Sequence, residues 1–185
     1  MKKILISILL IASNLSISQI SQLEIITKEN DTINDIVFKR RDLDNPTRNY
    51  KLQDEIVYLN RKMETIKLLP SQVNSFSFKY GEQLVRYESK DDKIFALVLY
   101  ENKLKLLRFL QRAYTPVDIY VVERQNGKTS FLEAMGLSRR ISLKVIKREF
   151  PDCPYTISKV ENDILKIQGE EGVLELIQDY EKSCY

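Results

Sequence analysis

The sequence predicts an α+β protein, in which an N-terminal antiparallel β-meander of about ten strands is followed by about three α-helices. Two observations lead to this prediction. Up to about Glu133, short segments of strand-forming residues are separated by turn residues, and apolar and polar side chains alternate within them. After Gly136, apolar residues recur with the helical period of about 3.6 instead. Strands joined by tight turns indicate a meander, either an open, strongly coiled sheet or a small closed barrel.

The first 18 residues have the pattern of a secretory signal peptide. Lys2 and Lys3 precede an apolar run that ends near Ala12, and this run is too short for a membrane span of about 20 residues. Small residues at Ser16 and Ser18 place the cleavage point before Gln19. We therefore expect residues 1–18 to be removed and residues 19–185 to form one mature domain, with the meander over 19–134 and the helical part over 135–185. Such a protein would be periplasmic or secreted, without a membrane span.

Ten segments of the meander are expected to be strands. They are Leu23–Lys28, Thr32–Lys39, Glu55–Leu59, Met63–Leu68, Val73–Lys79, Gln83–Glu88, Lys93–Tyr100, Lys103–Leu110, Val117–Arg124 and Lys128–Glu133. Residues 93–110 would also fit one amphipathic helix, but Glu101-Asn102-Lys103 interrupts two runs of strand formers, which favours a hairpin. Asn126-Gly127 is the strongest turn signal and predicts a type I′ hairpin. The polar stretch before residue 52, which contains Asn45-Pro46, predicts a loop.

Three helices are expected after residue 140. The first carries Ile141, Leu143, Val145, Ile146 and Phe150 and ends at Pro151; the second is capped by Asp152, has Pro154 in its first turn and carries Ile157, Val160 and Ile164. Gly169–Gly172 separates a third helix, on which Val173, Ile177, Tyr180 and Cys184 form one stripe.

Cys153 and Cys184 are the only cysteines. One lies at the start of the second helix and the other at the end of the third, and two antiparallel helices joined by a short loop bring these ends together. In an exported protein without a C-x-x-C pattern, this favours a structural disulfide. The alternative is a reactive thiol at a helix N-terminus, but no histidine or second close cysteine is present to activate it.

Composition excludes several function classes. Histidine is absent, which removes Ser-His-Asp and Cys-His catalysis and histidine-ligated zinc. None of the five glycines lies in a P-loop, dinucleotide-binding or G-x-S-x-G pattern. The net charge of +3 includes Lys2 and Lys3, which leaves about +1 on the mature chain. The basic runs Lys39-Arg40-Arg41 and Arg139-Arg140 are short and flanked by acids, so we expect solvated surface there and no nucleic-acid partner.

Carboxylates and aromatic residues are the remaining chemical resources. We expect Asp91-Asp92 to lie in a turn and Glu170-Glu171 to favour the start of a helix, rather than to be catalytic. Asp42, Asp44 and Asn45 resemble part of a calcium loop, but the glycine and the closing glutamate are missing. Five tyrosines on or beside the strands are expected to fill the core or to pair across strands, although a surface row of them would suit sugars or peptides; they are Tyr80, Tyr87, Tyr100, Tyr114 and Tyr120.

Three short motifs carry a resemblance. Together with the signal peptide, "LLPSQVNSFSF", "FPDCP" and "DYEKSCY" resemble a family of small exported proteins of Bacteroidota, especially flavobacteria. The resemblance implies export and the disulfide, and it implies no activity.

The sequence leaves three functions open. The first is a non-enzymatic module that binds an envelope protein or surface and needs no cofactor or metal. The second is a lipocalin-like carrier, whose meander closes around a small apolar ligand. The third is a hydrolase of glycan or cell-wall polymer, which would require two buried carboxylates in one cleft.

Overall fold

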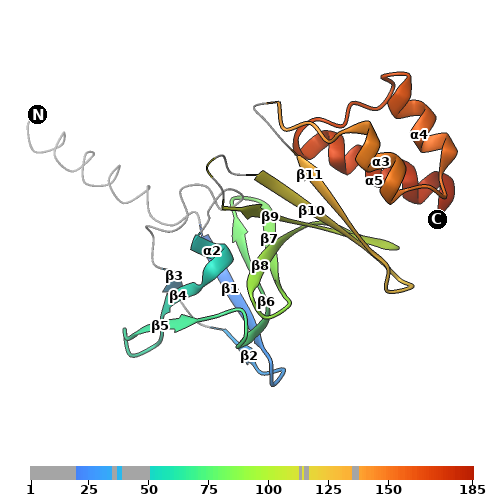
Figure 1. The fold of residues 1–185 in the computed structure, drawn as a ribbon. Helices are drawn as coiled ribbons and strands as arrows, with labels where there is room; N and C mark the ends of the chain where they lie inside the picture. The colour runs from blue at the N-terminus through green and yellow to red at the C-terminus, as the bar shows by residue number, and fades with distance from the viewer. Residues whose placement is uncertain (1–19, 35–36, 39–50, 113, 115–116, 135–137) are drawn as a thin grey trace, which may run out of the picture.

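The computed structural model describes residues 20–34, 37–38, 51–112, 114, 117–134 and 138–185. Within these residues the protein is α+β, with strands first and most helices near the C-terminus (Figure 1). One antiparallel sheet has eight strands in the order β11-β10-β9-β8-β7-β6-β1-β2, and a second has the order β3-β4-β5. The predicted α+β class is therefore confirmed. The larger sheet has two open ends, so the closed-barrel alternative is wrong.

Six consecutive strands, β6 to β11, form the predicted meander. The strands are β1 (Ile20–Thr27), β2 (Thr32–Ile33), β3 (Val37–Phe38), β4 (Ile56–Leu59), β5 (Thr65–Leu68), β6 (Val73–Tyr80), β7 (Gln83–Lys90), β8 (Ile94–Glu101), β9 (Leu104–Gln111), β10 (Val117–Arg124) and β11 (Thr129–Ala134). The expected single strand Thr32–Lys39 is wrong, because β2 and β3 belong to different sheets. A short helix, α2 (Lys51–Asp54), was not predicted.

The hairpin between β10 and β11 is confirmed, but its predicted turn type is wrong. Arg124 N donates to Lys128 O (3.0 Å), and Gly127 N donates to Arg124 O (2.9 Å). A type I′ turn needs positive φ at both central residues, and in this loop only Gly127 has it, at 80°. The loop is therefore a three-residue turn in which glycine supplies the left-handed position.

One row of opposed residues crosses seven strands on the same face of the large sheet. The row is Ile25, Phe76, Tyr87, Leu97, Arg108, Tyr120 and Leu132. All seven are buried, and Arg108 is the only charged one. We call this the covered face, and the other the opposite face.

The large sheet turns a corner at β8. The first half of β8, up to Leu97, pairs with β7, and the half from Leu97 onward pairs with β9. The end of β9 therefore loses its β8 neighbour, and Gln53 of α2 accepts a hydrogen bond from Leu110 N there (3.3 Å). A strand that serves two sheet directions in this way makes a bend. The corner divides the covered face into two halves.

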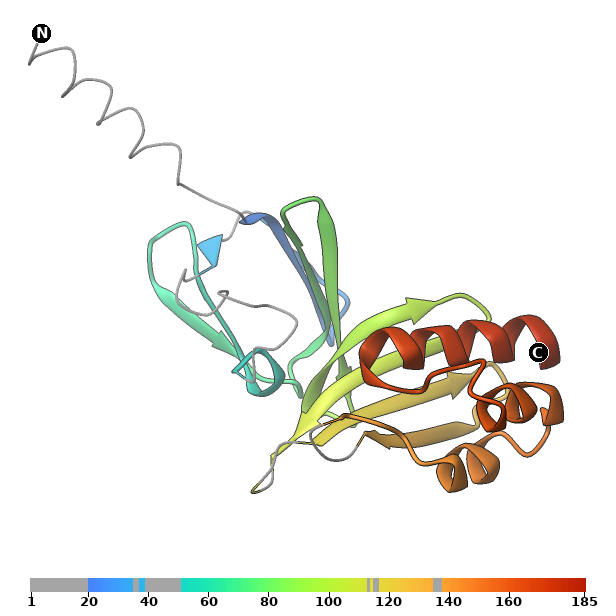
Figure 2. The same cartoon turned by 90° about the horizontal axis from the view of Figure 1, so that it is seen from above.

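The first half of the covered face, on β1 and β6–β8, is filled by α2 and the small sheet. The ring centroids of Phe76 and Tyr87 are 4.9 Å apart in a stacked pair, and Phe95 meets Phe76 edge-on at 5.0 Å. Leu52 of α2 and Ile56 of β4 close this cluster. Figure 2 shows β3–β5 at the opposite end of the molecule from the C-terminal helices.

The second half, on β9–β11, is covered by α3 (Leu143–Glu149), α4 (Pro154–Glu161) and α5 (Gly169–Cys184) (Figure 2). The three predicted helices exist, with corrected ends. Ile164 lies outside α4 and is 69% exposed, because Asp163 adopts a left-handed φ of 54° after the helix ends. The predicted separator Gly169–Gly172 is instead the first turn of α5.

Asp152 does not cap α4, contrary to expectation. The N-cap position is Cys153, and Asp152 accepts a hydrogen bond from the Tyr180 hydroxyl (2.8 Å). The aspartate thus ties the start of α4 to α5 rather than to its own backbone.

Arg124 anchors the helices to the end of β10. Its guanidinium donates to Ser130 Oγ (2.8 Å) and to the Glu149 carbonyl (3.0 Å), and it lies over the rings of Phe150 and Tyr180 at 5.3 and 5.4 Å. The buried charge of Arg124 is therefore stabilised by hydrogen bonds and by contacts with two aromatic rings.

Glu181, next to Tyr180 in the C-terminal half of α5, anchors the same helix to the β8–β9 hairpin. Its carboxylate accepts from Leu104 N (3.0 Å), Asn102 Nδ2 (2.6 Å) and the Tyr100 hydroxyl (3.2 Å).

In the part of the chain that the structure describes, no helix has the length and apolar character to cross a membrane.

Candidate functional site

The structure joins Cys153 and Cys184 in a disulfide, in agreement with the predicted pairing. Their Cα atoms are 5.6 Å apart, and Cys153 is fully buried. Val173, Ile177 and Tyr180 on the same stripe of α5 are buried as well. The bond therefore links α4 to α5 inside the helical layer.

The two acidic pairs of the sequence have different surroundings. Asp91 and Asp92 have φ values of 52° and 57°, and Lys93 N donates to Lys90 O (3.1 Å), so they are the central residues of a type I′ turn. Asp92 also pairs with Lys28 (2.6 Å). The other pair, Glu170-Glu171, lies in the first turn of α5 as expected, but Glu170 pairs with Arg108.

Only part of the basic and calcium-like candidates lies within the described residues. Arg139 pairs with Asp118 (3.4 Å) and Arg140 with Asp163 (3.6 Å). Lys39, Arg40 and Arg41 lie outside the described residues, as do Asp42, Asp44 and Asn45. Among the residues that are described, no three His, Cys, Asp or Glu side chains gather as a metal site would require.

The tyrosines divide between core and surface. Tyr87 and Tyr120 are buried in the row, which confirms the core interpretation for these two. Tyr80 and Tyr100 are half-buried, and Tyr114 is fully exposed. The five therefore do not form a surface row.

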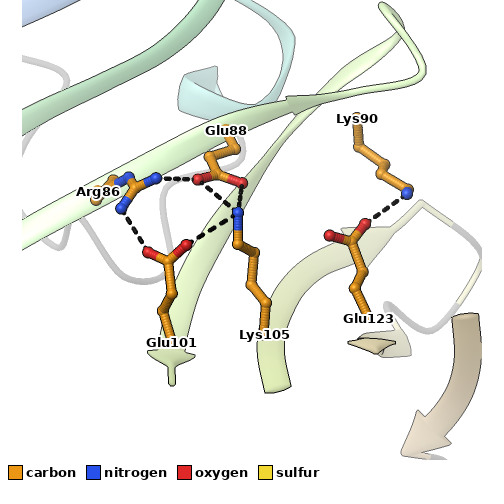
Figure 3. Close-up of polar contacts among 6 residues, drawn as sticks. All are labelled: Arg86, Glu88, Lys90, Glu101, Lys105 and Glu123. Carbon is orange, nitrogen blue, oxygen red and sulfur yellow. Dashed lines mark hydrogen bonds and ion pairs between the residues drawn. The ribbon is translucent and has the colours of Figure 1, made fainter. Parts of the chain in front are cut away.

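Six charged residues lie near the sheet corner on the opposite face, four in one network and two in a separate ion pair. This corner cluster consists of Arg86, Glu88 and Lys90 from β7, Glu101 from β8, Lys105 from β9 and Glu123 from β10 (Figure 3). Three cations face three carboxylates, so the cluster is electrically balanced. It lies beside a small apolar cluster of Ala96, Leu107, Ile119 and Val121.

The ion pairs of the corner cluster span several strands. Lys105 Nζ contacts Glu88 at 2.8 Å and Glu101 at 3.1 Å, and Lys90 reaches Glu123 at 2.6 Å. Lys90 and Glu123 belong to strands three positions apart in the sheet order. These contacts join strands on both sides of the bend at β8.

The electrostatics of the corner cluster favour ionised partners. Burial alone would raise the pKa of Glu101, but the hydrogen bond from Lys105 and the charges of Lys105 and Arg86 hold that pKa below its usual value. Burial alone would lower the pKa of Lys105, but its hydrogen bonds to Glu88 and Glu101 raise it. A group that transfers protons near neutral pH would need a raised carboxyl pKa or a lowered lysine pKa. The corner cluster has the opposite shifts, so it suits a structural role.

A second group of charges lies on the covered face, where the two halves meet. This seam cluster consists of Arg108 and Asp118, both buried, with Glu170 and Arg139, both partly exposed. Arg108 Nη1 donates to Glu170, whereas Arg108 Nε is buried and has no hydrogen-bond partner among the described residues. A buried donor without a partner is rare and calls for an explanation.

The chain positions the seam cluster through the start of α5. Gly169 N donates to Arg139 O (3.1 Å), and Ile141 N donates to Ile167 O (3.1 Å), so the segments before α3 and α5 are paired. At Gly172 an added Cβ would lie 2.0 Å from Lys166 O, so only glycine allows this segment to pack on the first turn of α5.

The two tyrosines beside the buried part of the seam cluster, Tyr87 and Tyr120, are buried as well. Burial raises the pKa of Tyr120 to about 12, with Asp118 raising it further and Arg108 lowering it. Burial also raises the pKa of Tyr87, while Arg108 lowers it and Glu170 raises it. Both phenols therefore stay neutral beside the charged groups.

Sequence reasoning missed Arg108, Asp118 and Arg124. Arg108 interrupts the apolar run "LKLLRFL" at an inward position of the strand, which is the one signal that could have indicated a buried charge. Comparisons with protein-family models, with curated proteins and with solved structures returned no match.

Proposed function

We propose that this chain is an exported, non-enzymatic binding module that takes an extended segment of a partner protein on the free edge of β11. The observation that carries the proposal is the position of β11, which ends the eight-stranded sheet and pairs there with β10 alone.

The backbone of β11 offers hydrogen-bonding groups to such a segment. The bond from Arg124 N to Lys128 O fixes the alternation along this hairpin, so the amides and carbonyls of Thr129, Phe131 and Glu133 point away from β10. Within the described residues these groups have no backbone partner. An incoming strand can therefore extend the ladder.

The side chains of β11 favour an apolar partner segment. Phe131 lies in the middle of the strand and is 48% exposed, with the buried Val121 directly opposite on β10. The strand has neither lysine nor proline, the residues that commonly protect a sheet edge, whereas the edge strand β5 carries Lys67. An alternating segment with an aromatic or branched residue beside Phe131 fits this edge.

Export and the Bacteroidota relationship are part of the proposal. The signal-like residues 1–18 and the Cys153–Cys184 disulfide support an oxidising compartment, periplasmic or extracellular. A partner in the envelope follows from that location.

Neither alternative function gains support from the geometry. A carrier needs an enclosed interior, but the sheet is open and side chains fill both halves of the covered face. A hydrolase needs two carboxylates within about 10 Å. Among the described residues the buried carboxylates are Asp118, opposite Leu110, and Glu181, bound at Leu104 N. These points are six steps apart along β9, or about 20 Å.

A peptide selection tests the proposal. A displayed library of random dodecapeptides is panned against the disulfide-bonded protein, and amide exchange is recorded with the best binder. We expect slower exchange at Thr129, Phe131 and Glu133, and roughly tenfold weaker binding, about 1.4 kcal/mol, for Phe131→Lys.

The matched control is Leu84→Lys, at another exposed apolar residue in a strand of the same sheet, which is 67% exposed against 48% for Phe131. It should leave binding unchanged. Protection of another surface by the best binder, or equal binding by the Phe131→Lys variant, would refute strand addition at β11.

A further inference from the structure

On the opposite face of the large sheet, rows of side chains run from β9 through β10 to the free edge of β11. In the register of these strands, the rows end at Thr129, Phe131 and Glu133. The row that ends at Phe131 is apolar throughout, and the row that ends at Glu133 contains Phe109 and Ile119. A strand added to β11 would continue these rows, so its side chains would lie directly beside their last members.

Glu133 is an exposed carboxylate without an opposite charge beside it. Its neighbours in the row are apolar, and within the described residues its side chain takes part in no ion pair or hydrogen bond. Other carboxylates on the same face are paired: Glu123 contacts Lys90 at 2.6 Å, and Glu88 contacts Lys105 at 2.8 Å. The unpaired acid therefore lies where an added strand would supply its missing neighbour.

Antiparallel pairing is the favoured direction for a strand added to β11. The backbone groups of Thr129, Phe131 and Glu133 point outward, so each residue can exchange two hydrogen bonds with the residue directly opposite. Antiparallel pairs are slightly more stable per residue than parallel ones, and the pairs within this sheet are antiparallel. In this direction the partner residue opposite Glu133 comes two positions before the one opposite Phe131.

From these observations we infer that the partner segment carries a lysine or arginine two residues before an apolar residue. It binds as an antiparallel strand, with the cation opposite Glu133 and the apolar side chain opposite Phe131. Opposite charges directly across two strands stabilise the pairing, and like charges weaken it. The inference rests on the proposed strand addition at β11 and specifies the chemistry of the segment that is added.

Two other roles of Glu133 make different demands. If two copies of β11 paired about Phe131, Thr129 would face Glu133, and neither carboxylate would gain a cation. A charge on an edge strand can also act only as a guard that discourages any added strand. Removal of such a guard would strengthen every partner alike, whereas a selecting carboxylate distinguishes basic from acidic partners.

The test compares peptide selections on two forms of the whole disulfide-bonded protein at low salt. The library of random dodecapeptides is panned against the natural chain and against Glu133→Lys, and the peptides that slow amide exchange at Phe131 are sequenced. We expect the natural chain to enrich lysine or arginine two residues before an apolar residue. Glu133→Lys should enrich aspartate or glutamate at the same position.

The matched control is Glu175→Lys, which makes the same change of net charge at an exposed glutamate of α5. Its selected peptides should show the preference of the natural chain. This control separates a local pairing at Glu133 from a general attraction between the protein and charged peptides.

Affinities of synthetic peptides give the size of the effect. The best binder of the natural chain should bind roughly fivefold more weakly when its cation is replaced by glutamate, and salt should reduce the difference. A peptide of the same composition, with the cation two residues after the apolar residue, should bind roughly threefold more weakly than the best binder. Glu133→Gln should bind the basic and acidic versions about equally.

Three results would overturn the inference and leave strand addition intact. They are protection of β11 by peptides without a cation preference, the same preference in Glu133→Lys as in the natural chain, and equal tightening of basic and acidic peptides by Glu133→Gln. If no selected peptide protects β11, the proposed function fails, and this inference fails with it.

Discussion

The two halves of the covered face share one sheet but are held together differently. On β1 and β6–β8, α2 and the small sheet cover an aromatic cluster centred on Phe76, and within the described residues no disulfide or buried charge lies in that cluster. On β9–β11, the three helices are fixed by the Cys153–Cys184 bond, by the buried Arg124 and by Glu181. Apolar packing organises the first half, and directed bonds organise the second.

The difference follows from the elements that each half must hold. A strand beside a sheet shares continuous hydrogen-bond ladders with its neighbours, whereas short helices depend on tertiary contacts for their order. α3 and α4 have only seven and eight residues. The covering helices of the second half share no hydrogen-bond ladder with the sheet, and anchors at defined points hold them there.

The largest effect is expected from Phe76→Ala in the first half. Phe76 is 1% exposed and contacts two other rings, so its truncation should lower the free energy of unfolding by about 3–5 kcal/mol. Urea unfolding measures this. Leu84→Ala, at a 67% exposed site on β7, should change stability by less than about 0.5 kcal/mol. Equal effects at the two sites would contradict the packing argument.

Loss of the disulfide should act on the second half. The bond closes a loop with a sequence separation of 31, so Cys153→Ser should cost about 3–4 kcal/mol on the chain-entropy model. Thermal melting gives the total, and amide exchange should show faster opening in α4 and α5 than in β6 and β7. Cys184→Ser breaks the same bond and should give a similar loss; an unchanged melting curve for either variant would disprove the structural role.

A smaller effect is expected at the corner cluster, which links the halves across the opposite face. Lys105→Ala removes contacts to Glu88 and Glu101, but all three side chains are partly exposed, so the loss should be about 1 kcal/mol. Chemical unfolding in low and high salt should show that salt reduces the difference. The exposed Lys79 is the control, and its replacement by alanine should be neutral.

The smallest effect concerns pH. Because the folded pKa of Glu101 is depressed, its contribution is complete above the ordinary value of 4.5 and is lost as the pH falls through the lower folded value. The folded pKa of Lys105 is raised, so its contribution is complete below 10.5 and is lost as the pH rises through the higher folded value. The stability difference between the natural protein and Glu101→Gln should be constant from about pH 6 to 9 and should shrink in acid. A difference that grows in acid would contradict this assignment.

Much of the fold could be predicted from local pattern. The β10 bounds agree residue for residue with the prediction, and the meander from β6 onward follows from alternation and turn residues. The division of residues 32–39 between two sheets could not be predicted, because pairing partners are set by distant strands. The turn at Asn126-Gly127 was recognised, but its type depends on the register of the hairpin.

The candidate site was less predictable. Glu170 and Glu171 are identical neighbours in sequence, and only the packing of α5 on β9 decides that the first meets Arg108. Arg108 itself becomes informative only when strand register places it in a row of buried apolar residues. Chemistry that arises from distant contacts leaves little trace in a single sequence.

The positions of the helical anchors have a consequence for biosynthesis. Three contacts of the sheet are made with residues near the end of the chain. Arg124 hydrogen-bonds to Tyr180, the β8–β9 hairpin to Glu181, and Gln125 N to the Tyr185 hydroxyl (2.9 Å). A chain emerges from the ribosome with its N-terminus first. The cover over Leu106, Tyr120 and Leu132 is therefore complete only when the last turn of α5 has emerged, and a holding chaperone would find its binding surface on this half of the nascent sheet.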